Sequence, residues 1–455
     1  MQIKKMRSRT VGLVVIALAI ATVSGCSSPG ASNSDSASTS PTVSTDVAAA
    51  GEVTLTVWDQ NTQGGIGAAT KQMNADFEAK YPNVTIDRVS VSFSDLKTTL
   101  KLALSSNTPP DVVQAGQGYP DMGAFIKANL LQNLTPYADV YGWDTRFSAE
   151  LLDRNRFTSD GKTWHTGDLY GLVNGAQLTG FFYNKSILSK LGLSVPKTIA
   201  EFESAMAVAK KKGITPLSFG NLDKSPGIHL FGAIQNAIAG KEAVRDLVYN
   251  AGGKWTDAST LTAAQTLVNW NKKGYIPSGS SGIAQDIAVA DFGNKKALFL
   301  LQGTWVLGQP LLDSSSTEVG FFVLNGGSST DPVTMGGTGL PWSITSKSAN
   351  PDVAAAYIDF VTGAYASQVL LDTGNFPALL PADWKPKAGT LIADVAATWK
   401  GISDANGLTP WLDQATFTFY DTLSAAAQDL ITGKKTPEAF TQTLQKDYAE
   451  FQSAR

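Results

Sequence analysis

The chain has little of what most catalytic and metal sites need. Its 455 residues include one cysteine, Cys26, and two histidines, His165 and His229. A single cysteine excludes a disulfide within the chain, and so few histidines and cysteines exclude a zinc cluster built from both. We therefore expect no metal site and no bound cofactor.

Positive charge is also scarce. The chain has 36 Lys and Arg against 39 Asp and Glu, and residues 1–25 hold four of the cations and no acid, so the remainder carries 32 − 39 = −7. Binding of nucleic acid needs clustered Lys and Arg. The composition therefore predicts a mildly acidic protein without a nucleic-acid partner.

Known catalytic motifs are missing from the sequence. The nearest approach to a nucleotide-binding P-loop is Gly161-Lys162-Thr163, but the first glycine of that motif falls on Arg156. No serine near either histidine has the Gly-x-Ser-x-Gly form of a nucleophile elbow. Paired carboxylates for glycoside hydrolysis form in space, so the sequence leaves them open, although no pair stands out.

The first 26 residues have the pattern of an export signal. Basic residues at 4–9 precede an apolar run, Val11 to Ala21, which is about half the ~20 residues that cross a bilayer. The run ends at Val23-Ser24-Gly25-Cys26, which resembles the bacterial lipobox. We expect residues 1–25 to be a signal peptide and Cys26 to carry a lipid that anchors the protein to the outer face of the cell membrane.

A polar segment follows the cysteine. Residues 27–50 contain 8 Ser and 3 Thr, no aromatic residue and two charges. Such a composition buries too little apolar surface to offset the entropy of ordering. Residues 26–50 are therefore predicted to be a lipidated cysteine followed by a flexible tether.

From residue 53 onward strand and helix patterns alternate. Residues 53–58 alternate polar and apolar side chains as a strand does, and Leu96, Leu100 and Leu104 recur at helical spacing. The order predicts an α/β protein with mostly parallel sheets. Further strands are expected at 84–86 and 111–114, and helices at 68–80, 95–105, 199–212, 261–273, 351–361 and 420–432.

Ligands of such folds bind beyond the carboxyl ends of the strands, where Trp58-Asp59 and 114–117 would lie. Several of the 10 tryptophans are flanked by Gly, Pro or Asp rather than set in periodic runs, at Trp58, Trp305, Trp342 and Trp411. Aromatic walls with a few placed polar groups are typical of ligand sites. The pattern favours a sugar, whose C–H faces stack on flat rings, although each tryptophan alone is more often part of a core.

Segments spread over residues 52–450 resemble the extracellular solute-binding proteins of ABC importers, the group that includes maltodextrin-binding protein. The segments are Leu-Thr-Val-Trp-Asp at 55–59, Phe-Glu-Ala-Lys-Tyr-Pro at 77–82, Pro-Asp-Val-Val at 110–113, Phe-Tyr-Asn-Lys at 182–185, Leu-Phe-Leu-Leu-Gln-Gly-Thr-Trp at 298–305, Gly-Gly-Thr-Gly-Leu at 336–340 and Pro-Asp-Val-Ala-Ala-Ala-Tyr at 351–357.

The resemblance implies a periplasmic-binding-protein-like fold of two α/β lobes, with hinge crossovers and a ligand cleft between the lobes. It implies crossings near 174–178, 322–326 and 362–367. The N-terminal lobe would then hold 51–174 and 326–362, and the C-terminal lobe 178–322 and 367–455.

The resemblance also implies sugar-binding positions. Trp305 matches an aromatic residue that stacks on a ring, Tyr420 falls where the maltodextrin binder has a stacking tryptophan, and Gln177 stands where an acidic residue is common. The expected set is Trp58, Asp59, Gln117, Gln177, Asp223, His229, Trp305, Gly337 and Tyr420, of which Gln117, His229 and Gly337 rest on loop position alone.

These features predict a monomeric binding protein that is not an enzyme. It would capture a neutral mono- or oligosaccharide by lobe closure and deliver it to an ABC permease with a separate ATPase. An anchored sugar-active enzyme, or a sugar sensor without transport, is the alternative. A glycerol phosphate or a peptide is a further candidate ligand, but a phosphate would call for cations at the cleft.

Overall fold

The computed structural model describes residues 43–62 and 64–454. The predicted signal peptide, Cys26 and the tether up to residue 42 lie outside the described residues. Residues 43–50, predicted to belong to the tether, pack on the folded body instead. Val47 is buried in a core, Asn83 donates to its carbonyl, and Ser44 N–H donates to Asp352. The apolar side chain of Val47 accounts for this difference.

The first sheet has four strands in the order β11-β3-β1-β2. Strands β1 and β2 pair in parallel, as do β1 and β3, whereas β11 is antiparallel to β3. Neighbours β2 and β3 lie on opposite sides of β1, so the point where the strand order reverses lies between β1 and β3. The bounds are β1 Val53–Asp59, β2 Val84–Ser90, β3 Val112–Gln114 and β11 Trp342–Ile344.

The second sheet has six strands in the order β12-β10-β6-β8-β7, with β9 also paired to β6. Its pairings are mixed: β6 is antiparallel to β8, β9 and β10, and the other two pairs are parallel. The prediction of mostly parallel sheets is therefore wrong for this sheet, because its central strand β6 runs against all its neighbours. The bounds are β6 Ala176–Asn184, β7 Thr215–Ser218, β8 Ala297–Gly303, β9 Val319–Phe322, β10 Thr334–Thr338 and β12 Leu408–Thr409.

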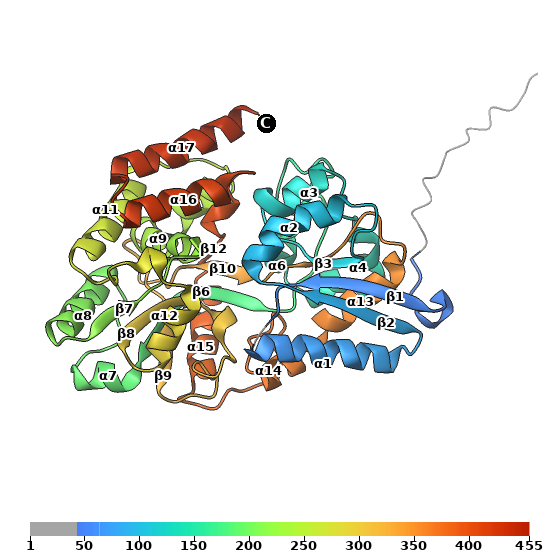
Figure 1. The fold of residues 1–455 in the computed structure, drawn as a ribbon, viewed down its shortest axis with the longest axis horizontal. Helices are drawn as coiled ribbons and strands as arrows, with labels where there is room; N and C mark the ends of the chain where they lie inside the picture. The colour runs from blue at the N-terminus through green and yellow to red at the C-terminus, as the bar shows by residue number, and fades with distance from the viewer. Residues whose placement is uncertain (1–42, 63, 455) are drawn as a thin grey trace, which may run out of the picture. The chain divides into compact units, whose positions relative to one another are not determined.

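Each sheet has its own helices, and we call each sheet with its helices a lobe (Figure 1). In the first lobe these are α1 Gly64–Lys80, α2 Phe93–Ser105, α3 Ala124–Lys127, α4 Thr135–Tyr141, α5 Trp143–Arg146, α6 Ala149–Asp153, α13 Pro351–Thr362 and α14 Ala364–Asp372, with the short ribbon β4 Arg156–Phe157 and β5 Asp168–Leu169.

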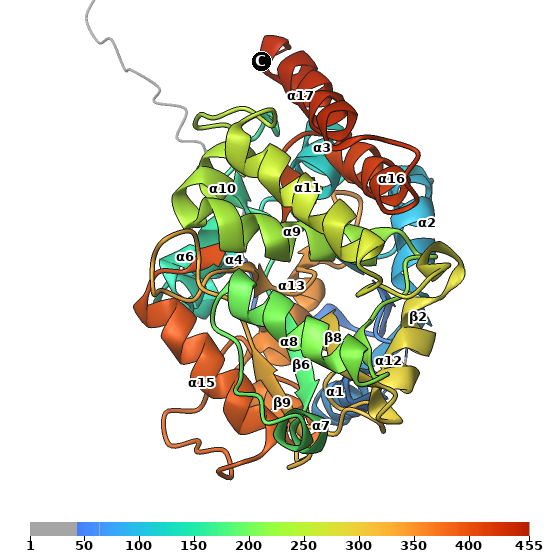
Figure 2. The same cartoon turned by 90° about the vertical axis from the view of Figure 1, so that its left-hand side faces the viewer.

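The second lobe contains α7 Lys185–Lys190, α8 Ile199–Lys211, α9 Ser225–Ala239, α10 Lys241–Val248, α11 Ala258–Lys272, α12 Gln285–Gly293, α15 Leu391–Asp404, α16 Phe419–Ile431 and α17 Pro437–Ser453. Figure 2 shows α8 in front of β6 and β8, α9 and α11 above them, and α15 and α12 on opposite sides. Short single-turn segments are η1 Ala48–Ala50, η2 Tyr119–Gly123, η3 Ser280–Gly282, η4 Thr304–Val306 and η5 Leu412–Gln414.

The helices expected from periodicity are present within a few residues of the predicted ends. In α2 the predicted stripe of Leu96, Leu100 and Leu104 is buried, and Ser92 caps the helix by accepting from the N–H of Asp95. In α8 Thr198 and Glu201 form a complete capping box. In the described part of the chain, no helix combines the length and the apolar character needed to span a membrane.

Two of the crossings between lobes lie later in the chain than the sequence predicts. The chain leaves the first sheet before β6, near the expected 174–178. Strand β10 still pairs with β6, so the return to the first sheet follows Thr338 rather than 322–326. Helix α14 packs on α1 and α13, so the last crossing follows residue 372 rather than 362–367. Long-range pairing of β10 and packing of α14 decide both positions.

The core of the second lobe is centred on aromatic side chains. Phe202 of α8 is fully buried, and its ring centroid lies 4.4 Å from that of Phe181, 4.7 Å from Phe299, 5.5 Å from Trp270 and 6.1 Å from Phe322. These rings belong to the sheet and to two helices that cover it. Phe202 therefore joins the helical layer to the sheet.

Replacing Phe202 with Ala should lower the free energy of unfolding by about 3–5 kcal/mol, because it removes buried contacts and leaves a cavity. Urea unfolding measures the change. The control is Leu102→Ala in α2, where the side chain is 78% exposed and the effect should stay within about 0.5 kcal/mol. Equal effects of the two substitutions would contradict this account of the core.

Candidate functional site

The end of β1 presents two predicted site residues to opposite faces of the sheet. Val53, Leu55 and Val57 alternate as the buried side chains of β1, and Asp59 continues that phase with no exposed surface. Trp58 therefore points to the other face, where it is partly buried against the core that includes α2. The two-residue period of a strand separates these neighbours.

The carboxylate of Asp59 accepts hydrogen bonds from four donors of the protein. Its Oδ2 accepts from Arg88 Nε at 2.5 Å, and its Oδ1 accepts from Arg88 Nη2 at 2.7 Å, from Ser90 Oγ at 2.9 Å and from Asn61 N–H at 2.7 Å. Four donors match the roughly four lone-pair sites of a carboxylate. In this arrangement Asp59 orders the loop after β1 rather than offering a free acceptor to a ligand.

Two glutamines connect the lobes behind this loop. Gln117, after β3, donates from Nε2 to the carbonyl of Thr338 at 2.9 Å and to that of Gly339. Gln414 of η5 donates from Nε2 to Gln117 Oε1 at 3.0 Å. Both glutamines are about 95% buried, and Gln414 Oε1 has no partner among the described residues. This pair forms a polar floor where the first lobe meets η5 of the second.

Gly337 and Gln177 face each other in the pairing of β10 with β6. Gly337 has φ +127°, and a Cβ placed on it would lie 2.8 Å from the guanidinium carbon of Arg154. That buried arginine follows α6 and donates from Nη1 to the carbonyl of Gly336 at 2.8 Å. Gly337 is thus required by backbone conformation and by the approach of Arg154. Gln177 is partly buried beside Gly339.

Three rings from separate parts of the second lobe meet near the floor. Trp305 of η4, His229 of α9 and Trp411 before η5 form an aromatic cluster with centroid separations of 5.1 Å for His229–Trp305, 5.6 Å for His229–Trp411 and 5.9 Å for Trp305–Trp411. Burial lowers the pKa of His229 to about 4, so its imidazole is neutral at pH 7. The cluster is therefore an uncharged aromatic wall with a polar ring edge.

Tyr420 lies at the start of α16 and meets the first lobe. The Nζ of Lys97, on α2, is 4.4 Å from the centroid of the Tyr420 ring, and Phe93 packs at 6.4 Å. Lys97 also pairs with both oxygens of Asp121 at 2.6 and 2.7 Å. Burial is the main cause that raises the pKa of Tyr420, and nearby Asp413 adds to it. Tyr420 therefore contacts an ion pair of the opposite lobe.

Asp223 lies on the Tyr420 side of the interlobe region. It is partly buried in the loop before α9 and accepts from the N–H of Gln285 at 3.0 Å. Its charge contributes to the raised pKa of Tyr420, so it faces the same region. One carboxylate oxygen of Asp223 has no donor among the described residues.

The structure brings most of the predicted residues to one interlobe region. Gln177 and Gly337 lie on β6 and β10, which carry two of the crossings, and Gln117 binds the end of β10. Trp305, His229 and Tyr420 lie on the second lobe. Direct contacts also join the lobes beside the last crossing, including a hydrogen bond from Gly65 N–H to the carbonyl of Gly308 at 3.1 Å. In residues 43–62 and 64–454 no group of His, Cys, Asp and Glu is arranged to hold a metal ion.

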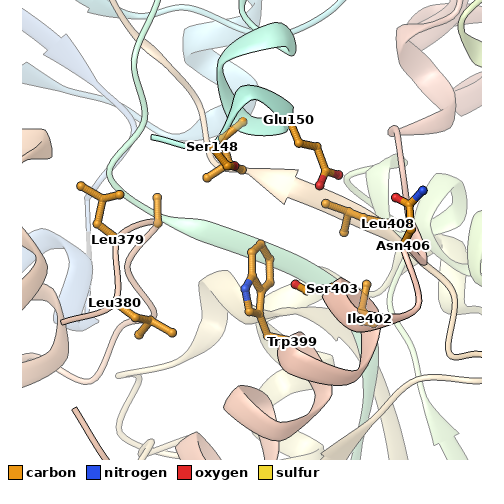
Figure 3. A pocket seen from close by; sticks show the side chains of 11 residues that line it. Ser148, Glu150, Leu379, Leu380, Trp399, Ile402, Ser403, Asn406 and Leu408 are labelled. Carbon is orange, nitrogen blue, oxygen red and sulfur yellow. The ribbon is translucent and has the colours of Figure 1, made fainter. Parts of the chain in front are cut away.

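Two hollows lie away from these residues. One of about 390 Å³ is bounded by α6, residues 378–380, α15 and β12, with Trp399 and Glu150 on its walls (Figure 3). The other, of about 500 Å³, lies between residues 210–216 and 271–278. Neither is lined by a predicted site residue. The candidate site is therefore described by its side chains, which converge where the two lobes meet.

Comparison with known proteins agrees with this architecture. Residues 60–368 match the family described as bacterial extracellular solute-binding protein. The chain belongs to that family. The multiple sugar-binding protein of Streptococcus mutans is 24% identical over 331 residues, which cover 72% of this chain and 75% of that protein. An uncharacterized ABC transporter extracellular-binding protein of Pyrococcus horikoshii is 30% identical over 307 residues, covering 65% and 66%.

Solved structures show the same two-lobed fold. A chitin oligosaccharide binding protein superposes with a TM-score of 0.77 at 24% identity, covering 88% of this chain and 99% of the other. A sugar transporter protein from Bacillus licheniformis in complex with stachyose gives a TM-score of 0.68 at 17% identity, covering 88% and 100%. These likenesses confirm the predicted fold class of the solute-binding protein.

The sequence-based set omits several residues of this region. Trp411 follows a proline and was among the tryptophans singled out from the sequence. The polar residues Asp413 and Gln414 that come soon after it could have been added on that basis. Lys97 and Arg154 gave no such signal. Their roles depend on partners distant in the chain, Tyr420 and Gly336.

Replacing Gly337 with Ala should destabilise the protein by about 1–3 kcal/mol, because φ +127° is unfavourable for any Cβ and Arg154 must also move. Urea unfolding measures the effect. Gly213→Ala is the matched control, since Gly213 has φ +72° but open space around it, and it should cost about 1 kcal/mol. A Gly337 variant no less stable than the Gly213 variant would refute the packing role of Arg154.

Proposed function

We propose that this solute-binding protein captures a neutral sugar, in particular an oligosaccharide, for an ABC importer and is not an enzyme. The observation that carries the proposal is the aromatic cluster of Trp305, His229 and Trp411 beside the amides of Gln117 and Gln414. Sugar rings stack their C–H faces on aromatic walls while their hydroxyls need polar partners. The names of relatives that bind sugars support it.

The charges near the floor favour a neutral ligand. Arg88 is engaged by Asp59, Lys97 by Asp121, and Arg154 by the Gly336 carbonyl. A phosphate-bearing solute would need a cation free to bind it. Each of these three cations already has a protein partner, which supports a sugar over a glycerol phosphate.

Capture proceeds by closure of the lobes on the ligand. The contacts that join the lobes, Gln117 with Gln414 and Gly65 with Gly308, belong to a closed arrangement. A ligand shifts the protein toward the closed arrangement only as far as it binds the closed arrangement more tightly than the open one. The closed protein is then the form delivered to a membrane permease powered by a separate ATPase.

Replacing Trp305 with Ala should weaken sugar binding by about tenfold or more, because truncating an aromatic anchor costs about 2 kcal/mol. Thermal shifts with raffinose, stachyose, galactose and chitin oligosaccharides select the ligand, and calorimetry gives its dissociation constant. Trp399→Ala on α15 is the control and should bind as the wild type does.

Unchanged affinity of the Trp305 variant would overturn the stacking assignment. If none of these sugars stabilised the wild type, the sugar proposal itself would fail. Release of reducing ends from the same oligosaccharides would instead support a sugar-active enzyme.

We also propose that Cys26 anchors the protein to the membrane through lipid. Replacing Cys26 with Ser should move the protein from the membrane fraction to the soluble fraction and abolish incorporation of labelled palmitate, since the thiol is the acylated group. Ser27→Ala, which keeps the thiol, is the control. A Cys26→Ser protein that still fractionates with membranes would rule out this anchor.

A further inference from the structure

One carboxylate of the interlobe region receives no hydrogen bond from any other residue that the structure describes. Asp413 lies on η5 between Trp411 of the aromatic cluster and Gln414 of the polar floor, and it is partly buried. Among the described residues, the hydrogen bond that reaches its carboxylate comes from its own backbone N–H. Asp59, by contrast, receives four donors from three other residues.

Charged and titratable groups from both lobes face Asp413. Lys97 on α2 and Asp121 on η2 lie across from it in the first lobe, and Tyr420 lies on α16 of the second lobe. Asp223, in the loop before α9, faces the same Tyr420. Because Asp121 already pairs with Lys97, the cation is shared, and Asp413 remains without a dedicated partner.

We propose that Asp413 is the specificity-determining carboxylate of the site: it accepts hydrogen bonds from hydroxyl groups of the bound sugar and disfavours sugars that carry a carboxylate. This inference rests on the proposed function. An ionised carboxylate is an acceptor only, and two oxygens in one plane match two neighbouring hydroxyls of a pyranose ring. An acidic sugar would bring a further negative charge next to Asp413 and Asp121.

The position of Asp413 gives the site a dependence on pH. Burial raises the pKa of Asp413 to about 6, while Lys97 partly opposes the shift. Hydroxyl donors stabilise the ionised form, so sugar binding lowers this pKa again. Affinity is therefore full above the pKa of the free protein and falls as the pH drops through 6. His229, with its pKa near 4, stays neutral over that range.

The experiment compares calorimetric binding by wild type, Asp413→Asn and Asp421→Asn, using the sugar of the panel that stabilises the wild type most. Asp421→Asn removes the same charge from an exposed position on α16 and should change the dissociation constant less than twofold. Asp413→Asn should raise it about tenfold to a hundredfold, the range for a lost hydrogen bond to a charged group.

Between pH 7.5 and pH 5 the wild type should lose about tenfold in affinity, as expected from ionisation near pH 6, and Asp413→Asn should lose almost none. Asp413→Glu, which keeps a carboxylate, should retain the pH dependence and serves if the Asn variant does not fold. Digalacturonate should bind the wild type more weakly than the neutral sugar.

The outcomes separate the two hypotheses. If no neutral sugar binds the wild type, the proposed function fails and this inference fails with it. If the wild type binds but Asp413→Asn binds equally well, or keeps the pH dependence, only the role of Asp413 is overturned. Tighter binding of digalacturonate than of the neutral sugar would likewise overturn it. So would sugar affinities of the wild type and of Asp413→Glu that do not change with pH.

Discussion

The pairing of β6 with β10 is the constraint on which the rest of this structure depends. These strands take the chain out of the first lobe and back into it, and their register places Gln177 opposite Gly337. Arg154 of the first lobe fills the space where a side chain at 337 would lie, and Gln117 binds the carbonyls at the end of β10. Both contacts tie the first lobe to strands of the second sheet. The closure proposed above would turn about this pair of strands, since hinges of this kind let a few residues absorb the change.

The second feature of the interlobe region is that its cations and several of its carboxylates are paired with each other. Asp59 with Arg88 and Lys97 with Asp121 are paired within the first lobe, so that lobe presents charges whose fields largely cancel at a distance. The second lobe offers Asp413 and the partly exposed Asp223 instead. A ligand rich in hydroxyl donors satisfies such acceptors without bringing a charge of its own into a partly buried region, where an unpaired charge is costly. Charge and aromatic surface thus favour the same class of ligand.

The aromatic cluster shows how the second lobe assembles its wall. His229, Trp305 and Trp411 come from a helix, from the turn after a central strand and from the segment after the edge strand β12. Their rings come within 6 Å of one another only because the sheet and α9 place these segments side by side. Offset and tilted ring arrangements of this kind stabilise each other and keep one another's orientation fixed. A wall ordered before the ligand arrives loses less entropy on binding.

The sequence by itself determined the local pattern of this protein: the strand alternation of 53–58, the leucine stripe of α2, the later helices and the ordered set of segments that resemble solute-binding proteins. These features depend on residues close together in the chain. The tertiary structure decided what depends on distant partners. In the folded protein Asp59 is buried against Arg88, and the ring of Trp411 packs beside that of Trp305. Val47, expected in the tether, lies in a core, and two crossings lie closer to the C-terminus than predicted. The physical reason is that periodicity specifies which face of an element is apolar, whereas the partner of a polar or aromatic side chain is specified only when elements far apart in the chain pack together.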